Sequence, residues 1–393
     1  RFTGEFSQGG NRNIFHTYNP EASLYGQDRW EYEGMVINYG LRWDMFSPGN
    51  AAAIELANDD IDANVVLYKT AFQPRLGFAF PITERDGFYF HYGRFVQFPS
   101  REYLFASQDP VGNAGVLGNP NLDPETTVQY SAGIKHQFND HIAGQFSLYS
   151  KDIYDLIAAT TVNDVSTGTI LTRQINMAYA SARGVEMTLD KRYSDHYQFR
   201  FAYTYSFADG VASDPTFGSN PEGAEYLPNQ ELPLNWDQRH TLNIMFLLAE
   251  PGVWSSAFTF SYGSGFPWTP NDRFSKKTDP MLENSMRLPS TYNLDVQLER
   301  NINVYGNRLS LQLQVFNLLN QDIVVSPGGG GINPGMINGA EYRGMSYLTE
   351  TGKFGAALLQ DEDGDGVDEY IPIVDPRTFG AHRLFRIGLG YYF

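Results

Sequence analysis

Carboxylates gather near the C-terminus at a spacing that could hold a metal ion. Residues 361–369 read Asp-Glu-Asp-Gly-Asp-Gly-Val-Asp-Glu, with acidic side chains at alternating positions and a glycine at the sixth. Such a loop can wrap oxygen ligands around Ca²⁺. Position twelve, where an EF-hand carries a bidentate Glu, is Pro372, so other residues would have to complete the shell. The pattern is that of either a calcium site or a solvated acidic loop, and the candidate ligands are Asp361, Asp363, Asp365, Asp368 and Glu369.

Other residue types that carry chemistry are not arranged for catalysis. The seven His are dispersed, with no pair at metal-ligand spacing. Gly263-Ser264-Gly265 lacks the strand, turn and helix of a nucleophile elbow. The four glycines at 328–331 precede no helix whose N-terminus could bind phosphate. We therefore expect a protein that is not an enzyme and that has no cofactor apart from the candidate calcium.

The last nine residues show what kind of element must carry such a loop. From Phe385 to Phe393 the odd positions are Phe, Ile, Leu, Tyr and Phe, and the even positions are Arg, Gly, Gly and Tyr. One side of this strand is apolar. A transmembrane β-barrel presents apolar side chains to lipid and polar or small ones to its lumen, so the strand is typical of a barrel.

The same alternation recurs along the chain. It is found in residues 35–44, 185–190, 197–207, 292–299 and 309–315. In the fourth of these segments the second face carries Asn293, Asp295, Gln297 and Glu299, which suits a wet lumen rather than a packed core. The sequence predicts an all-β protein, a transmembrane antiparallel β-barrel. The alternative is a soluble β-sandwich or propeller, whose strands alternate too.

The connections between these segments favour the barrel, because short and long ones alternate. The predicted short connections are 31–34, 81–87, 138–141, 191–196, 248–252 and 300–307, and the long ones are 47–70, 97–124, the stretch after Asp152, 208–236, 263–289 and 321–381. Bacterial barrels have short periplasmic turns and long extracellular loops. The count is about 13 strands, or 14 if residues before Phe15 form another.

Composition agrees with a bacterial outer-membrane location, with lipid as a partner. Aromatic residues make up 15% of the 393 residues, as expected where Tyr and Trp line two membrane interfaces. The formal charge of −17 argues against nucleic acid as a partner. No window approaches the length of apolar sequence that a transmembrane helix needs. Because there is no Cys, disulfides and thiolate metal sites are excluded.

Several motifs, taken in order, resemble the TonB-dependent outer-membrane receptors. They are Leu24 to Trp30, Asn38 to Asp44, Gln73 to Gly77, Tyr92 to Phe95, Asn119-Pro120-Asn121-Leu122-Asp123-Pro124-Glu125, Arg183 to Glu186, Asn235 to Asn243 and Phe316 to Asn320. Their order and spacing look most like the Oar-like branch, whose members carry a carboxypeptidase-regulatory-like domain before the plug.

The resemblance implies a 22-stranded barrel filled by an N-terminal plug, with a periplasmic segment that engages the TonB energy-transducing complex. Residues 1–393 are then the C-terminal part of the barrel, and the plug and N-terminal domain are not present in this chain. Phe393 is predicted to pair with a strand upstream of Arg1. Tyr391 and Phe393 are the expected signal for the barrel assembly machinery.

Two functions remain open at this stage. The first is import of a scarce nutrient, such as a chelated metal, a glycan or a peptide. The second is a structural or docking barrel that binds surface lipoproteins, secretion machinery or other cells through its large loops; a passive porin is a third reading. Because a recognition surface must face outwards, the candidate contact residues are the loop aromatics Tyr226, Phe266, Trp268 and Tyr342. Charges predicted to face the lumen include Arg42, Arg200, Arg386, Asp295 and Glu299.

Overall fold

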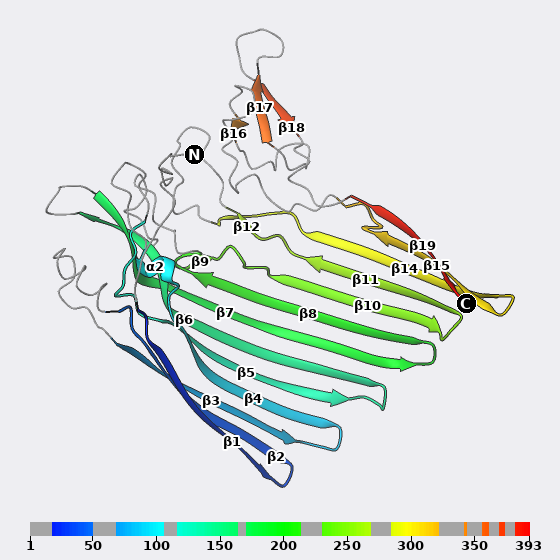
Figure 1. Cartoon of the computed structure of the whole chain (residues 1–393), viewed down its shortest axis with the longest axis horizontal. Helices are drawn as coiled ribbons and strands as arrows, with labels where there is room; N and C mark the ends of the chain where they lie inside the picture. Colours follow the sequence, from blue (N-terminus) through cyan, green and yellow to red (C-terminus); the bar gives the residue numbers. More distant parts are fainter. Residues whose placement is uncertain are drawn as a thin grey trace, which may run out of the picture.

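Most of the described chain forms one curved antiparallel sheet (Figure 1). The computed structural model describes residues 18–49, 68–105, 116–163, 170–213, 230–268, 284–321, 342–343, 356–360, 369–373 and 382–393. Fourteen strands make up the sheet. They are β1 (Glu21–Tyr32), β2 (Met35–Phe46), β3 (Lys69–Pro81), β4 (Asp86–Gln97), β5 (Glu125–Gln137), β6 (Ile142–Asn163), β7 (Ile170–Ser194), β8 (Tyr197–Gly210), β10 (His240–Glu250), β11 (Trp254–Gly263), β14 (Thr291–Val304), β15 (Asn307–Phe316) and β19 (Leu384–Tyr392), with β9 (Leu232–Pro233) against β8.

Each long strand pairs with its neighbours in the chain, and this register gives the sheet two different faces. Tyr39 stands opposite Leu76, whereas Arg42 stands opposite Gln73. Because successive side chains of a strand point to opposite faces, one face of the sheet is apolar and the other is polar. The all-β antiparallel fold is therefore confirmed. The total of 22 strands in a closed barrel stays a prediction.

Short turns join the strands at one end of the sheet. The pairs Glu33-Gly34, Asp195-His196 and Tyr305-Gly306 all have positive φ at both residues. Two-residue hairpin loops of this type, type I′ turns, match the right-handed twist of the flanking strands. The predicted alternation of short and long connections is confirmed by the strand bounds. In a bacterial barrel the end with the short turns faces the periplasm.

An acid and a histidine join two hairpins at the short-turn end. Asp86 Oδ1 lies 2.5 Å from His136 Nδ1, and the hydroxyl of Thr83 donates to the other carboxylate oxygen of Asp86 at 2.5 Å. The hydrogen bond from Thr83, followed by that from His136, lowers the pKa of Asp86. The carboxylate therefore fastens the turn before β4 to the end of β5.

The β6–β7 pair differs from the loop that the sequence predicted after Asp152. Both strands continue beyond their neighbours, so that Asn163 still pairs with Ile170. The register shifts between Ile153 and Leu156, and Asp155 has a φ of 60°. This irregularity starts a hairpin that projects from the end of the sheet opposite the short turns (Figure 1).

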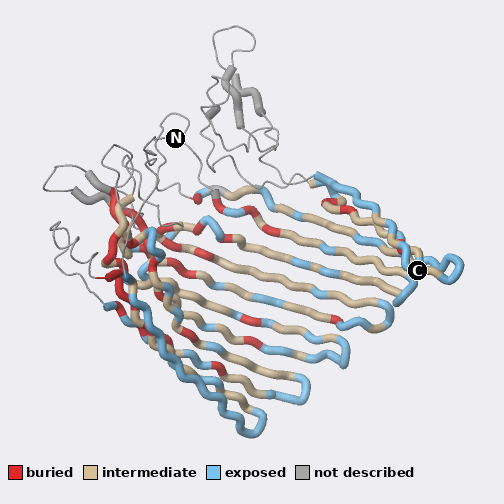
Figure 2. The backbone as a smooth tube through the Cα atoms, viewed as in Figure 1, coloured by how far each residue is buried: buried red, intermediate tan, exposed pale blue. Residues whose placement is uncertain are grey.

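Most of the buried residues lie at the end with the long connections (Figure 2). The largest cluster consists of Phe46, Leu104, Leu122 and Ile157, with Leu104 supplied by the short helix α2 (Arg101–Phe105). Two alanine-rich clusters lie near it, Ala158 with Ala178 and Ala212, and Ala180 with Ala208 and Leu234. A single-layer sheet has no second layer against which to bury its faces, so a core forms only where loops fold back over the strand ends.

Two further sheets are small, namely β12 (Pro267–Trp268) with β13 (Met286–Arg287), and β16 (Tyr342–Arg343), β17 (Ala356–Gln360) and β18 (Glu369–Ile373). Within the described residues, β1 and β19 form the two edges of the main sheet, and β19 pairs with β15. The predicted pairing of Phe393 stays a prediction. No helix in the described part of the chain is long and apolar enough to cross a bilayer.

Candidate functional site

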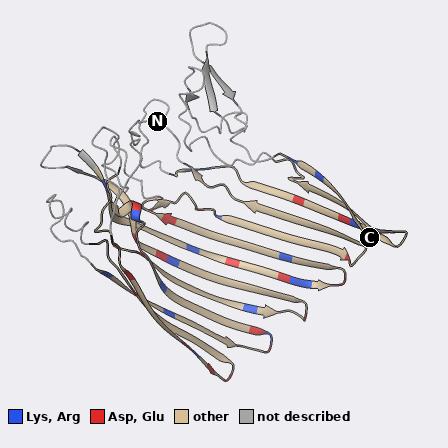
Figure 3. Ribbon diagram, in the orientation of Figure 1, with Lys and Arg blue, Asp and Glu red and all other residues tan. Residues whose placement is uncertain are grey.

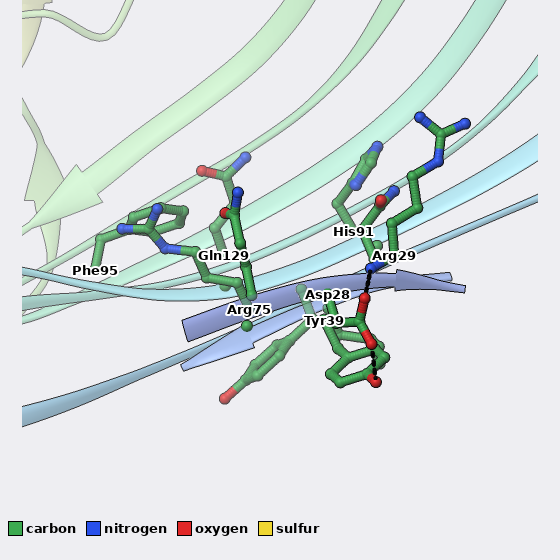
Figure 4. Close-up of a pocket in the computed structure, with 14 residues that line it drawn as sticks. Asp28, Arg29, Tyr39, Arg75, His91, Phe95 and Gln129 are labelled. Carbon is green, nitrogen blue, oxygen red and sulfur yellow. Dashed lines mark hydrogen bonds between the residues drawn. The ribbon is translucent and has the colours of Figure 1, made fainter. Parts of the chain in front are cut away.

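A cavity of about 740 Å³ lies on the polar face across strands β1 to β5 (Figure 4). Arg29, Arg75, His91 and Gln129 project into it from one side of the sheet, while the Tyr39 side chain leaves from the other side. Glycines form much of its floor, namely Gly40, Gly77 and Gly93. The site is therefore a shallow groove lined by basic and amide groups.

Strand register explains why these groups meet. One row of paired residues crosses five boundaries and contains Gln27, Gly40, Arg75, Gly93, Gln129 and Lys151. The next row toward the short-turn end contains Arg29, Asn38, Gly77, His91, Ser131 and Tyr149. We call these twelve residues the basic rows. They hold three Lys or Arg and one His but no carboxylate, in a chain whose formal charge is −17. Over the sheet as a whole, basic and acidic residues are both spread along the strands (Figure 3).

Carboxylates border the basic rows rather than enter them. Beyond one end, Arg42 donates to both oxygens of Asp44, at 2.7 and 2.8 Å. On the other side, Glu31 pairs with Arg29 at 2.5 Å. Arg42 and Asp295, which the sequence predicted to face the lumen, both lie on the polar face of the sheet. Asp295 accepts a hydrogen bond from the backbone N–H of Asn317 at 2.8 Å. These acids are therefore already engaged by their own neighbours.

Three cations on the polar face rest on aromatic rings instead of acids. Arg75 lies 4.9 Å from the ring centre of Phe95, and Lys151 lies 5.6 Å from that of Tyr149. Lys135, two rows outside the basic rows, lies 5.4 Å from the ring of Tyr89. In the described part of the chain none of the three forms an ion pair. A ring face attracts the cation but leaves its N–H donors free for a ligand.

Each of these rings lies over a glycine of a neighbouring or the same strand. A Cβ at Gly93 would lie 2.7 Å from the Phe95 ring, and one at Gly184 would lie 2.7 Å from the Tyr149 hydroxyl. At Gly133 it would lie 2.5 Å from the Tyr89 hydroxyl and 2.6 Å from the carbonyl oxygen of Phe146. The glycines therefore let the rings lie flat along the wall, and the rings in turn hold the cations.

Replacing Gly133 by alanine is expected to lower the free energy of unfolding by about 1–3 kcal/mol, because the new methyl group cannot fit without moving the backbone. The matched control is Gly26→Ala, since a Cβ at Gly26 has no atom within 4 Å. The control is expected to change stability by less than about 0.5 kcal/mol. Urea unfolding of the detergent-solubilised protein, followed by tryptophan fluorescence, measures both. Equal losses in the two variants would contradict the role of Gly133.

The residues predicted to bind calcium or ligands are not brought together within the described chain. Tyr226, Asp361, Asp363, Asp365 and Asp368 lie outside the described residues. Glu369 begins β18, opposite Gln360 of β17. Among the described residues no cluster of three potential metal-ligating side chains occurs. The calcium site stays a prediction.

The predicted aromatic contacts lie on separate segments. Phe266 is 43% exposed near the end of β11, and Trp268 of β12 stands opposite Met286. Tyr342 of β16 stands opposite Leu358 of β17. At the other end of the chain, the Tyr391 and Phe393 rings lie 6.3 Å apart, and Phe393 is fully exposed. Their roles as contacts or as an assembly signal stay predictions.

A buried carboxylate that sequence analysis missed organises the end of the sheet with the long connections. The Asp237 side chain is fully buried and pairs with Arg239 at 2.8 Å and with Arg287. It also accepts the backbone N–H of Ala208 at 2.9 Å. We call these groups the Asp237 clasp. Asp237 stands within the motif Asn235 to Asn243, so the motif marked the segment but not its partners.

A second buried charge holds the Asn119 to Glu125 motif. The Lys69 side chain is 5% exposed, and its ammonium pairs with Asp123 at 2.7 Å. Asn119 donates to the carbonyl of Gln174 at 2.9 Å and accepts from Arg173 at 3.0 Å. The motif is therefore fixed both to the start of β3 and to the projecting β7.

The sheet has a single layer, one apolar and one polar face, short turns at one end and clasped loops at the other. These features define the wall of an outer-membrane β-barrel. The chain belongs to the family described as TonB dependent receptor-like, beta-barrel, which matches residues 2–318. It is thus an outer-membrane protein. None of the curated proteins matches it.

Several solved structures share the fold at low sequence identity. The outer membrane transporter YddB from Escherichia coli is 13% identical, with a TM-score of 0.57, over 80% of this chain and 43% of that chain. The copper transporter OprC is 15% identical, with a TM-score of 0.52, over 95% and 47%. BauA, the ferric preacinetobactin receptor from Acinetobacter baumannii, is 11% identical, with a TM-score of 0.52, over 95% and 43%. The chain spans less than half the length of these structures.

Proposed function

We propose that this chain is the C-terminal barrel portion of a TonB-dependent receptor that binds a scarce nutrient at its extracellular face and imports it with energy from the inner membrane. The observation that carries the proposal is the family match over residues 2–318, supported by a wall whose polar face offers a groove. Among the nutrient classes, a chelated metal comes first, because two similar structures are named as a copper transporter and a ferric preacinetobactin receptor.

The partners follow from this function. The TonB complex would act through a plug and an N-terminal region upstream of Arg1, and the Oar-like branch, with its carboxypeptidase-regulatory-like domain, remains our choice within the family. Outer-membrane lipid would cover the apolar face, and the barrel assembly machinery would act on the C-terminal strand β19. Calcium bound by residues 361–369 would order an outer loop.

The importer is tested by uptake in cells that depend on this receptor, with radiolabelled ferric preacinetobactin and copper as the first probes. Accumulation is expected in cells with the receptor, and it should be lost both without the receptor and without TonB. Uptake that persists without TonB would indicate a passive pore. Such a result would contradict the proposal.

A docking role is the second candidate, and the projecting β6–β7 hairpin favours it. This hairpin continues past the ends of its neighbours to Asn163 and Ile170, which gives a surface lipoprotein an extended arm to bind. The test replaces residues 157–175 with a short turn. If the trimmed receptor still supports TonB-dependent uptake but no longer co-purifies a surface lipoprotein, docking is a separate function of the hairpin; unchanged co-purification would exclude it.

A further inference from the structure

The basic rows point to a particular class of ligand. We propose that they bind a multivalent oxyanion, a solute that carries two or more carboxylate or phosphate groups, as it passes along the lumen. This inference rests on the proposed transport function and names the substrate chemistry of the groove. It is carried by the placement of Arg75 and Lys151 on one row, with Gly93 and Gln129 between them.

The spacing of the two cations suits one extended solute. Neighbouring strands lie about 4.8 Å apart, so the Cα atoms of Arg75 and Lys151, three strands apart, are separated by about 14 Å. Both side chains are long, and both can lean toward the middle of the row. A solute lying along this row would thus meet a cation at each end, with the Gln129 amide and the Phe95 ring, which covers Gly93, between them.

The donors of the groove match oxyanions rather than neutral or cationic ligands. Arg supplies a fork of N–H groups that fits carboxylate and phosphate oxygens, and Lys supplies three N–H donors. Gln27, Asn38 and Gln129 add amide donors around the groove.

The local electrostatics leave these cations for a ligand to neutralise. Arg75 and Lys151 rest on aromatic rings, and their rows contain no carboxylate. Three acids lie nearby. Asp28, which also lines the groove, accepts from the Tyr39 hydroxyl at 2.9 Å, and Glu31 pairs with Arg29. Glu186, which lines a second cavity of about 220 Å³ beside Lys151, accepts from the Ser147 hydroxyl at 3.4 Å. An anion that enters the lumen could therefore bind Arg75 and Lys151 without first breaking an ion pair of either cation within the described residues.

The test is calorimetric titration of the full-length receptor, purified in detergent, with citrate and, separately, with inorganic pyrophosphate. We expect saturable binding of at least one probe at low ionic strength. The double variant Arg75→Gln/Lys151→Gln should weaken that binding at least tenfold. The probe that binds more tightly tells whether carboxylate or phosphate chemistry is preferred.

The matched control is Arg200→Gln. Arg200 is also a lumen-facing arginine, but it pairs with Asp190 at 3.4 Å and lies outside the basic rows. The control should bind as the unaltered receptor does. Absence of saturable binding of both probes, or equal weakening by the control, would overturn the inference. Binding is measured without uptake, so the two proposals can fail separately. TonB-dependent uptake without anion binding would contradict only this inference. Anion binding without TonB-dependent uptake would contradict only the transport function.

Discussion

Asp237→Ala is expected to lower the free energy of unfolding by about 3–5 kcal/mol, because removing one partner of a buried ion pair leaves the other charges uncompensated. The substitution would leave Arg287 without its carboxylate partner, Arg239 with only the more exposed Asp209, and the Ala208 N–H without its acceptor. Arg287 also donates to the carbonyl oxygens of Asp237 and Gly265. The loss would therefore free the segments before β10 and after β11 together.

The control for this variant is Asp209→Ala. Asp209 also faces Arg239, at 3.5 Å, but its side chain is 33% exposed, so a loss of less than about 1 kcal/mol is expected. Urea unfolding of the receptor in detergent measures both variants. Hydrogen exchange should increase at Ala208 and Leu234 in Asp237→Ala alone. A loss no greater than that of the control would show that the clasp does not stabilise the fold.

Phe46→Ala is expected to have a comparable effect, lowering the free energy of unfolding by about 3–5 kcal/mol. Phe46 is 2% exposed, packs in the cluster with Leu104 and Leu122, and stacks on Phe98 with ring centres 5.1 Å apart. The lost side chain would leave a cavity that helix α2 and the Asn119 to Glu125 motif cannot both fill. Faster hydrogen exchange at Leu122 is the local sign of this change.

Phe266→Ala serves as the control for the second variant. Phe266 lies at the same end of the sheet but is 43% exposed, so its loss should change stability by less than about 1 kcal/mol. Thermal unfolding monitored by the mobility of the receptor on semi-native gels gives an independent measure. If Phe46→Ala unfolds at the same temperature as Phe266→Ala, the cluster is not a stabilising core.

The strands and their faces could be predicted because their signal is local. Alternation such as that of residues 197–207 appears in a few consecutive residues, and turn lengths are equally local. The arrangement of side chains across strands could not be predicted in this way. Arg75 and Lys151 share a row only because β3, β4, β5 and β6 adopt one register, and a slip of one residue would move either side chain to the other face.

The ion pairs at the end of the sheet with the long connections could not be predicted from the sequence for a related reason. Lys69 meets Asp123, and Asp237 meets Arg287, across long stretches of chain. No periodicity links such residues, and the motifs around Asn119 and Asp237 identify the family without naming the partners. Phe46 illustrates the same limit. It lies on the same face of β2 as the polar residues Arg42 and Asp44, yet it is buried because α2 folds over it. Its burial depends on tertiary structure alone.

The consecutive pairing of the strands also gives the wall a mechanical order. Among the described residues, the long strands pair in chain order, each with the long strand before it and the one after it. The stability of the sheet therefore resembles that of a linear array of nearest-neighbour interfaces. A force applied at Phe393 would peel β19 from β15 first and then remove hairpins in turn toward the N-terminus. The Asp237 clasp, which ties β8, β10 and β13, would be the point at which this peeling stalls.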